Sequence, residues 1–95
     1  MALKFEWDER KNHGNFRKHG IWFEEAQTIW TDSAAIEFFD PEHSVHEERF
    51  VRIGHSIRAN LLLVVFCERD SGGILRIISA RRATNAEGKQ YEEGI

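Results

Sequence analysis

Apolar and polar residues alternate at the start of the chain, where residues 3–7 read Leu-Lys-Phe-Glu-Trp. This period of two predicts a short strand. Residues 9–19 follow as a predicted helix between Asp8, a favourable N-cap, and Gly20, which tolerates the left-handed conformation that ends many helices. Phe16 is the only large apolar residue in this segment. A core-packing helix normally carries an apolar stripe, so the composition indicates selection for something other than packing.

Helical spacing recurs at Phe23, Ala26, Ile29 and Trp30, which predicts a second short helix over about residues 23–30. Four later segments have strand-like patterns, at residues 35–39, 49–54, 61–69 and 74–80. Turn signals separate them at Asp40-Pro41 and at residues 70–73. The apolar run at residues 61–66 is typical of a central strand.

A terminal helix is predicted from the capping-box pair Thr84 and Glu87. Gly88 lowers the stability of this helix by about 1 kcal/mol relative to Ala. Tyr91 is expected on the same helix, with its ring packed against the sheet; stacking a base or donating a proton are the alternatives.

The order of elements is one strand, two helices, several strands joined by short turns, and one helix. Short connections favour antiparallel pairing, and helices grouped before the strands favour coverage of one sheet face. The prediction is an α+β fold in a single domain over residues 1–95, because 95 residues leave no room for a second core. We expect an antiparallel sheet of about four strands, with two N-terminal helices packed on it and a short C-terminal helix.

Composition places the chain among ordinary globular proteins, with 41% hydrophobic and 31% charged residues. The lone Cys67 excludes an internal disulfide and fits a reducing compartment. The N-terminus lacks the pattern of a signal peptide. The apolar run at residues 61–67 is too short to span a bilayer, which takes about 20 residues in a helix. We therefore expect a soluble cytoplasmic protein.

Charge is distributed unevenly, although the formal net charge is −3. Residues 37–48 contain five acidic side chains and no Lys or Arg. Residues 49–82 contain seven arginines against Glu68 and Asp70, a local surplus of five positive charges. This surplus either gives one face a positive field or is neutralised when folding mixes the charges on the surface.

Several motifs in order along the chain resemble the BrnT toxin family. The first is Phe5-Glu6-Trp7-Asp8-Glu9-Arg10-Lys11-Asn12 followed by Asn15, Lys18-His19-Gly20 and Phe23-Glu24-Glu25-Ala26. The others are Asp40-Pro41-Glu42-His43-Ser44, Glu47-Glu48-Arg49-Phe50, Ile53-Gly54 and Arg76-Ile77-Ile78-Ser79-Ala80-Arg81-Arg82-Ala83-Thr84, then Glu87 and Tyr91. Together the motifs cover about residues 3–93, which makes the resemblance specific.

The resemblance implies a small RelE-like fold and a ribonuclease toxin of a type II toxin–antitoxin pair that inhibits translation. It also implies neutralisation by a BrnA-like antitoxin with a ribbon-helix-helix domain, so that operator DNA is contacted only through the antitoxin. No cofactor, metal or membrane is expected. RNA cleavage in this class proceeds without metal, by attack of the ribose 2′-hydroxyl on the neighbouring phosphate.

This chemistry needs a base, an acid and cations around the phosphate. Histidine is the usual proton-transfer side chain, which makes His19 a candidate, and Lys18 can bind phosphate, although both also suit the negative end of a helix. Arginine binds phosphate through two parallel hydrogen bonds. The predicted catalytic residues are Lys18, His19, Arg52, Arg76 and Arg81.

Strict alternation along the last strand places Arg76 with Ile78 and Ala80 on one face and Arg81 on the other. Arg81 lies at the strand end, where alternation need not persist, so the two arginines can still converge. Arg49 and Arg69 are instead expected to pair with glutamates at the surface.

Two rival functions rest on other features. Ala59-Asn60 stands where the family commonly has Gly-Arg, and Gly88 stands where it commonly has Arg, which favours an inactive antitoxin-binding module that acts in operon repression. His43 and His46 beside glutamates suggest a metal-binding regulator. Their spacing matches no established zinc signature, so a solvated acidic loop is the better interpretation. Aromatic residues serve elsewhere: Trp22, Phe23 and Trp30 are expected to be core or interface anchors.

Overall fold

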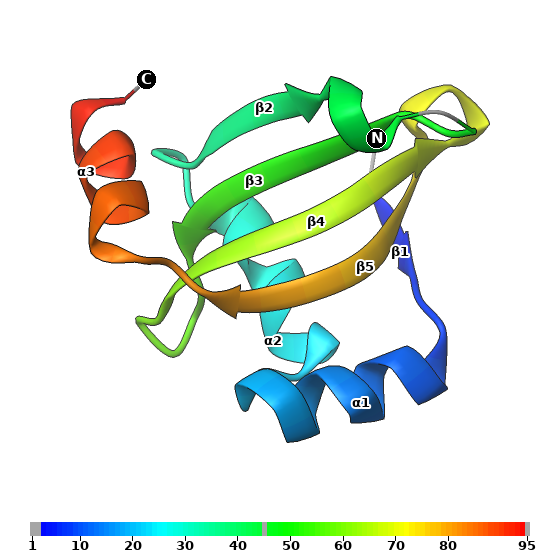
Figure 1. The fold of residues 1–95 in the computed structure, drawn as a ribbon, viewed down its shortest axis with the longest axis horizontal. Helices are drawn as coiled ribbons and strands as arrows, with labels where there is room; N and C mark the ends of the chain where they lie inside the picture. The colour runs from blue at the N-terminus through cyan, green and yellow to red at the C-terminus, as the bar shows by residue number, and fades with distance from the viewer. Residues whose placement is uncertain (1–2, 45, 95) are drawn as a thin grey trace.

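The computed structural model describes residues 3–44 and 46–94, shown as a ribbon in Figure 1. Its helices are α1 (Glu9–His19), α2 (Phe23–Ala26) and α3 (Asn85–Glu93), with 3₁₀ segments η1 (Gln27–Thr31), η2 (Pro41–His43) and η3 (Asp70–Gly72). Its strands are β1 (Lys4–Glu6), β2 (Ile36–Asp40), β3 (Arg49–His55), β4 (Leu61–Arg69) and β5 (Ile74–Arg82). The predicted α+β class is confirmed. Among the described residues, no helix is long and apolar enough to cross a membrane.

All strands join one sheet in the order β1-β5-β4-β3-β2. The sheet therefore has five strands, where about four were predicted. It is also mixed, because β1 runs parallel to β5 while the other pairs are antiparallel. The expected antiparallel sheet followed from short turns, and those turns constrain only β2 to β5. β1 pairs with a strand that lies far along the chain, with α1 and α2 in between, so no hairpin sets its direction.

The core lies between the sheet and the helices α1, α2 and η1, which share one face (Figure 1). The helical side contributes Ile21, Phe23, Ala26 and Ile29, and the sheet contributes Leu62, Val64, Ile77 and Ala80. Trp30 packs against this cluster, and Phe23 is fully buried, so both are core anchors as expected. Trp22, in contrast, stays partly exposed. We call the opposite side, which carries Ile53, Leu63 and Arg81 and is covered by α3 only at one end, the open face of the sheet.

Helix α1 is the polar helix that the sequence predicted, with both predicted caps. The Asp8 carboxylate accepts hydrogen bonds from the backbone N–H groups of Arg10 and Lys11, and Gly20 ends the helix at φ 73°. Its buried residues are Asn12 and Asn15 rather than apolar side chains.

Asn15 attaches α1 to the sheet through the backbone of β5. Its amide Nδ2 donates to the carbonyls of Ile21 and Ala80, both at 2.8 Å, and its Oδ1 accepts from the Ala80 N–H at 3.1 Å. β1 covers only residues 74–76 of β5, so the later part of that edge has no neighbouring strand among the described residues. The Asn15 side chain supplies there the donor and acceptor that a peptide group of a strand would supply. This explains why a helix without an apolar stripe packs on the core.

The Asn12 side chain likewise attaches the segment after α1 to that helix. Its Oδ1 accepts a 2.8 Å hydrogen bond from the backbone N–H of Phe23, and its Nδ2 donates to Glu9 and Glu24. The start of α2 is thereby fixed against α1.

The second predicted helix, over residues 23–30, is split. One α-helical turn is followed by the 3₁₀ segment η1. Thr28 Oγ1 donates to the Glu25 carbonyl, and Thr31 Oγ1 donates to the Thr28 carbonyl. Threonine hydroxyls that bond to nearby carbonyls compete with the regular α-helical pattern, which accounts for the change.

Candidate active site

The arginines of the sheet are the first candidates for phosphate contact. Arg52 lies on the face covered by η1, where its guanidinium carbon is 5.2 Å from the centre of the Trp30 ring. Its Nη1 is 2.9 Å from Glu37 Oε1 on the neighbouring strand β2. Arg52 is thus occupied on both sides, by a carboxylate and an aromatic ring.

Arg76 and Arg69 meet acidic side chains near β1. Arg76 Nη1 is 2.8 Å from Glu6 Oε2, and Arg69 lies 3.8 Å from the same oxygen and 3.7 Å from Glu47. The expected surface pairing of Arg69 is confirmed. Arg49, for which the same was expected, forms no ion pair within residues 3–44 and 46–94.

Arg81 forms a two-pronged ion pair with Glu87 of α3. Its Nη1 and Nη2 are 2.8 and 2.9 Å from the two carboxylate oxygens. This contact raises the pKa of Arg81 and, with the Thr84 backbone N–H, lowers the pKa of Glu87 to about 2. Arg81 is consequently a fixed, fully charged group at the rim of the open face.

A bulge in the sheet changes the faces that alternation predicted for β5. The β4–β5 register shifts between Val65 and Phe66, and Ile78 is the extra residue. Arg76 therefore points to the open face together with Arg81, and Ala80 points to the core. The prediction that placed Arg76 with Ala80 was wrong, because a bulge reverses the alternation on one side of it.

The predicted surplus of positive charge is largely neutralised by folding. Four of the seven arginines in residues 49–82 pair with carboxylates, namely Arg52, Arg69, Arg76 and Arg81. Their partners come from β1, β2, the acidic loop of residues 42–48 and α3. Of the two alternatives open from the sequence, mixing of charges on the surface therefore describes this region.

Unpaired positive charge is found instead at the end of α1. The last turn carries Arg17, Lys18 and His19. Arg82, at the end of β5, reaches the same place, since its Nη1 is 3.9 Å from the position a Cβ on Gly20 would take. Among the described residues, no carboxylate lies within ion-pair distance of these four side chains. We call this group the basic end of α1.

The structure thus separates the predicted catalytic residues. Lys18 and His19 share the basic end of α1, where Arg82 joins them although it was not predicted. Arg52 lies on the covered face, and Arg76 and Arg81 on the open face.

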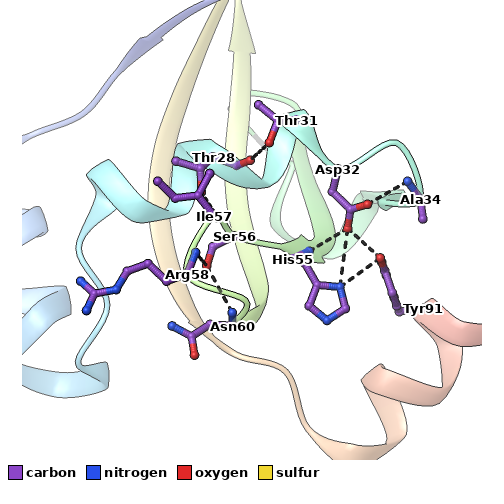
Figure 2. A network of polar contacts seen from close by, with 10 residues as sticks. All are labelled: Thr28, Thr31, Asp32, Ala34, His55, Ser56, Ile57, Arg58, Asn60 and Tyr91. Carbon is purple, nitrogen blue, oxygen red and sulfur yellow. Dashed lines mark hydrogen bonds and ion pairs between the residues drawn. The ribbon is translucent and has the colours of Figure 1, made fainter.

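A second polar arrangement, between η1, β3 and α3, contains His55, which was not among the predicted catalytic residues (Figure 2). Asp32 Oδ2 accepts hydrogen bonds from Tyr91 Oη at 2.7 Å and from the His55 backbone N–H at 2.8 Å. Asp32 Oδ1 accepts from the Ala34 N–H at 2.9 Å. His55 Nδ1 lies 3.1 Å from Tyr91 Oη. Tyr91 therefore bonds through its hydroxyl and also places its ring edge-on to His55.

These contacts select one tautomer of His55. The hydrogen bond to Asp32 raises the pKa of Tyr91 to about 12, so the tyrosine keeps its proton and donates it to Asp32. The tyrosine oxygen is then an acceptor, and His55 Nδ1 is its donor. In the neutral form of His55 this arrangement leaves a lone pair on Nε2, on a side chain that is 47% exposed. Such an imidazole can take up a proton from a bound molecule.

Gly54 is the sequence feature that permits this arrangement. A Cβ at this position would lie 3.0 Å from the Ala35 Cβ and 3.4 Å from Asp32 Oδ2. Only glycine lets η1 and the segment after it approach β3 this closely. The pattern Gly54-His55 was visible in the sequence, but Asp32 and Tyr91 are too distant in the chain for spacing to connect them with it.

The acidic loop offers a weaker case for metal. His43 Nδ1 is 2.8 Å from Asp40 Oδ2, so its partner is a residue of β2. Within the described residues, no three His, Cys, Asp or Glu side chains are grouped so that they could hold a metal ion. Residue 45, in the middle of this loop, lies outside the described residues.

Comparison with known proteins gives these geometries a context. A family model described as "Ribonuclease toxin, BrnT, of type II toxin-antitoxin system" matches residues 7–87. The chain belongs to the BrnT family. The crystal structure of the Brucella abortus ribonuclease toxin BrnT is similar, with a TM-score of 0.66 and 27% identity. That similarity covers 88% of this chain and all of the Brucella chain. No curated protein sequence matches this chain.

The BrnT match includes all five predicted catalytic residues and the elements from α1 to β5. In the first family motif, Asp8 and Gly20 cap α1, and Asn12 and Asn15 attach it to the rest of the molecule. Most of this BrnT motif is therefore structural. Lys18 and His19, its last residues before Gly20, are exposed and half-exposed, and Glu9, Arg10 and Lys11 in the first turn are exposed as well.

Proposed function

We propose that this BrnT-family chain is a metal-independent endoribonuclease of the cytoplasm that inhibits translation. In this proposal a BrnA-like ribbon-helix-helix antitoxin neutralises it and carries the pair to operator DNA. Membership of a ribonuclease toxin family supports the RNA substrate and the existence of an antitoxin.

The observation that carries the proposal is the basic end of α1. Its cations lack carboxylate partners among the described residues, whereas Arg52, Arg76 and Arg81 are each paired. Lys18 and Arg82 can therefore bind an RNA phosphate without first losing an ion pair. An unpaired cation gains more binding free energy from an anionic ligand than a cation that must first release a carboxylate partner.

In the proposed reaction, His19 accepts the proton of the ribose 2′-hydroxyl. The 2′-oxygen then bonds to phosphorus, and the bond from phosphorus to the 5′-oxygen breaks. Lys18 and Arg82 stabilise the added negative charge on the phosphate oxygens. The 5′-oxygen takes a proton from solvent or from a protonated histidine, which leaves a 2′,3′-cyclic phosphate and a 5′-hydroxyl.

The proposal keeps three paired arginines as phosphate contacts, namely Arg52, Arg76 and Arg81. Each must exchange its carboxylate partner, Glu37, Glu6 or Glu87, for an RNA phosphate. His55 is an alternative proton-transfer group to His19, because its Nδ1 is fixed and its Nε2 is accessible.

The test is cleavage of a naked RNA by antitoxin-free protein in EDTA, with analysis of the product ends. We expect cyclic phosphate and 5′-hydroxyl ends, and a rate at least about 100-fold lower for Lys18→Ala and His19→Ala. Lys11→Ala, a lysine in the first turn of the same helix, is the matched control and should cleave normally. His55→Ala decides between the two histidines, and Arg81→Ala tests the open face.

The second candidate function is an inactive antitoxin-binding module. It is favoured by Asn60, which takes the place of a basic residue and donates a 2.8 Å hydrogen bond to Glu25. Intact RNA in the presence of folded protein, both with and without ribosomes, would replace the nuclease by this module. Cleavage only with ribosomes would keep the nuclease and make it ribosome-dependent.

A further inference from the structure

A groove of about 570 Å³ lies between α1, α2 and the loop of residues 56–60 that joins β3 to β4. Its walls include Trp22, His13 and Ile57, and its acidic residues are Glu9, Glu24 and Glu25. The groove is separate from the basic end of α1, because it is formed by the first half of that helix. No part of the proposed RNA chemistry uses it.

Ile57 is exposed in a way that folding does not explain. It is 76% exposed, the highest value among the large hydrophobic residues described. Leu3, Phe16 and Phe39 are 46%, 39% and 49% exposed. A single exposed apolar residue on a flexible loop would be unremarkable, so the rigidity of this loop decides its meaning.

The loop is held in place by hydrogen bonds to α2 and η1. The Ile57 backbone N–H donates to Thr28 Oγ1 at 3.0 Å. Glu25 Oε2 accepts from Ser56 Oγ at 2.7 Å and from Asn60 Nδ2 at 2.8 Å. The backbone on both sides of Ile57 is therefore fixed, and its side chain is presented to solvent in one place.

Ala59 shows that this loop conformation costs energy. Its φ is 63°, in the left-handed region that disfavours residues with a Cβ. The hydrogen bonds around it maintain this strained turn, with the Ala59 N–H donating to the Ser56 carbonyl at 2.9 Å. Exposure of an isoleucine on a strained loop does not stabilise the fold, which points to a binding role for Ile57.

An aromatic wall stands opposite Ile57. The Trp22 ring stacks on Phe16 with 4.1 Å between ring centroids and meets the edge of His13 at 5.3 Å. Trp22 is thus fixed between two neighbours while part of it remains accessible. A rigid aromatic beside an exposed aliphatic residue is the usual composition of an anchoring site for a protein partner.

Charge narrows the identity of the partner. Glu9, Glu24 and Glu25 line the groove against one arginine, Arg58, so its net charge is negative. RNA phosphates are repelled by such a surface. A second copy of the chain using the same groove would bring two acidic surfaces together, which is unfavourable in a symmetric dimer.

We propose that this groove binds a segment of the cognate antitoxin that combines a large apolar side chain with a lysine or arginine. The apolar side chain packs between Ile57 and Trp22, and the cation lies against Glu9 and Glu24. Only the existence of an antitoxin, which family membership supports, is taken from the proposed function. The surface does not depend on whether the chain cleaves RNA.

The test measures the affinity of the full-length antitoxin for four forms of this protein by calorimetry. Ile57→Asp puts a charge at an exposed position, so the fold is retained and affinity should fall by about 30-fold, as for a residue at the centre of an interface. Phe39→Asp is the matched control, an exposed aromatic on β2, and should change affinity by less than about 3-fold. Glu24→Gln keeps the oxygen that accepts from Asn12 but loses the charge, and should weaken binding most at low salt.

Each alternative occupant gives a different result. Equal affinities of the Ile57→Asp and Phe39→Asp proteins for the antitoxin would overturn the proposal. A change in oligomeric state of the isolated Ile57→Asp protein, measured by light scattering, would assign the groove to a second copy. Weaker RNA binding with unchanged antitoxin binding would assign it to RNA. If the unmodified protein fails to cleave RNA both with and without ribosomes, the nuclease proposal fails, while the affinity comparison still tests the proposal for the groove.

Discussion

Helices α1 and α3 are both polar, yet they are attached to the sheet by different means. α1 uses buried amides: Asn15 bonds to the backbone of Ala80, in the interior of the molecule. α3 contains no buried residue and lies beyond the strand ends (Figure 1), where Glu87 pairs with Arg81 and Tyr91 bonds to Asp32. Glu87 and Tyr91 are one helical turn apart, so both contacts come from one side of α3.

The difference teaches that a polar helix can be either part of the cooperative core or an attachment to it. The Asn15 bonds involve no titratable group and cannot be made without the folded edge of β5. The contacts of α3 join charged and titratable side chains that are partly accessible to water. We therefore expect α1 to unfold only with the whole molecule and α3 to open separately at lower cost.

The largest expected effect comes from Asn15→Ala. It leaves the N–H and carbonyl of Ala80 without partners in a buried place, and we expect a loss of about 3 kcal/mol in the free energy of unfolding. Urea denaturation monitored by tryptophan fluorescence measures this loss. Asn85→Ala, an exposed asparagine in α3, is the control and should change stability by less than about 0.5 kcal/mol. Similar values for both variants would contradict the cooperative attachment of α1.

Acid should release α3 before α1. The contact with Arg81 lowers the pKa of Glu87 to about 2, so its stabilising contribution is complete above its usual pKa, about 4.5, and is lost as pH falls toward 2. We expect amide hydrogen exchange, corrected for its intrinsic pH dependence, to show loss of protection in α3 while α1 remains protected.

Glu87→Gln at neutral pH should reproduce this loss at a cost of about 1–2 kcal/mol, reduced from the full effect of the pKa shift by partial exposure to water. Glu92→Gln, on the same helix and without an ion pair among the described residues, is the matched control. Loss of protection in α1 and α3 at the same pH would contradict the separate opening of α3.

Tyr91→Phe removes only the hydroxyl of the second contact. We expect a cost of about 1 kcal/mol to α3, since one hydrogen bond to a carboxylate is lost and the ring still packs against His55. The Asp32 pKa, which this hydroxyl helps to lower, should rise. Nuclear magnetic resonance titration of Asp32 measures the shift, and an unchanged pKa would mean that the hydroxyl bond does not form in solution.

The smallest expected effects come from replacing two glycines, one in α1 and one in α3. A methyl group on Gly14 in α1 would meet no other atom within 4 Å, and a methyl group on Gly88 in α3 would meet only Leu61, at 3.7 Å. Replacement of either by Ala should stabilise its helix by up to about 1 kcal/mol. Gly14→Ala should raise the global free energy of unfolding, whereas Gly88→Ala should raise only the local protection of α3. A global gain from both would show that α3 belongs to the cooperative core.

Much of the local structure was predictable, because its causes lie within a few residues. Asp8 and Gly20 delimit α1 as predicted, and Thr84 with Glu87 forms the predicted capping box. The polar character of α1 also indicated that packing alone did not select its residues. The sequence did not show that buried amides attach this helix to the sheet, since the partner of Asn15 lies 65 residues away.

The candidate site was less predictable for the same reason. Lys18 and His19 were predicted from one motif, and they lie together because they are adjacent in a helix. Arg82 joins them, and His55 meets Asp32 and Tyr91, only because the chain returns to the same place. The pairing of Arg52 with Glu37 required the β2–β3 register, which spacing alone does not set.

The sequence by itself determined the strand-forming segments, both ends of α1, the start of α3 and, through its ordered motifs, the family. These features depend on side-chain periodicity and on hydrogen bonds between near neighbours, which any short stretch of chain reveals. Only the tertiary structure decided the direction of β1, the faces of Arg76 and Arg81, the arginines that remain unpaired, and the groove beside Ile57. Each of these depends on groups brought together from distant parts of the chain, where a single bulge or an added strand changes which side chains meet.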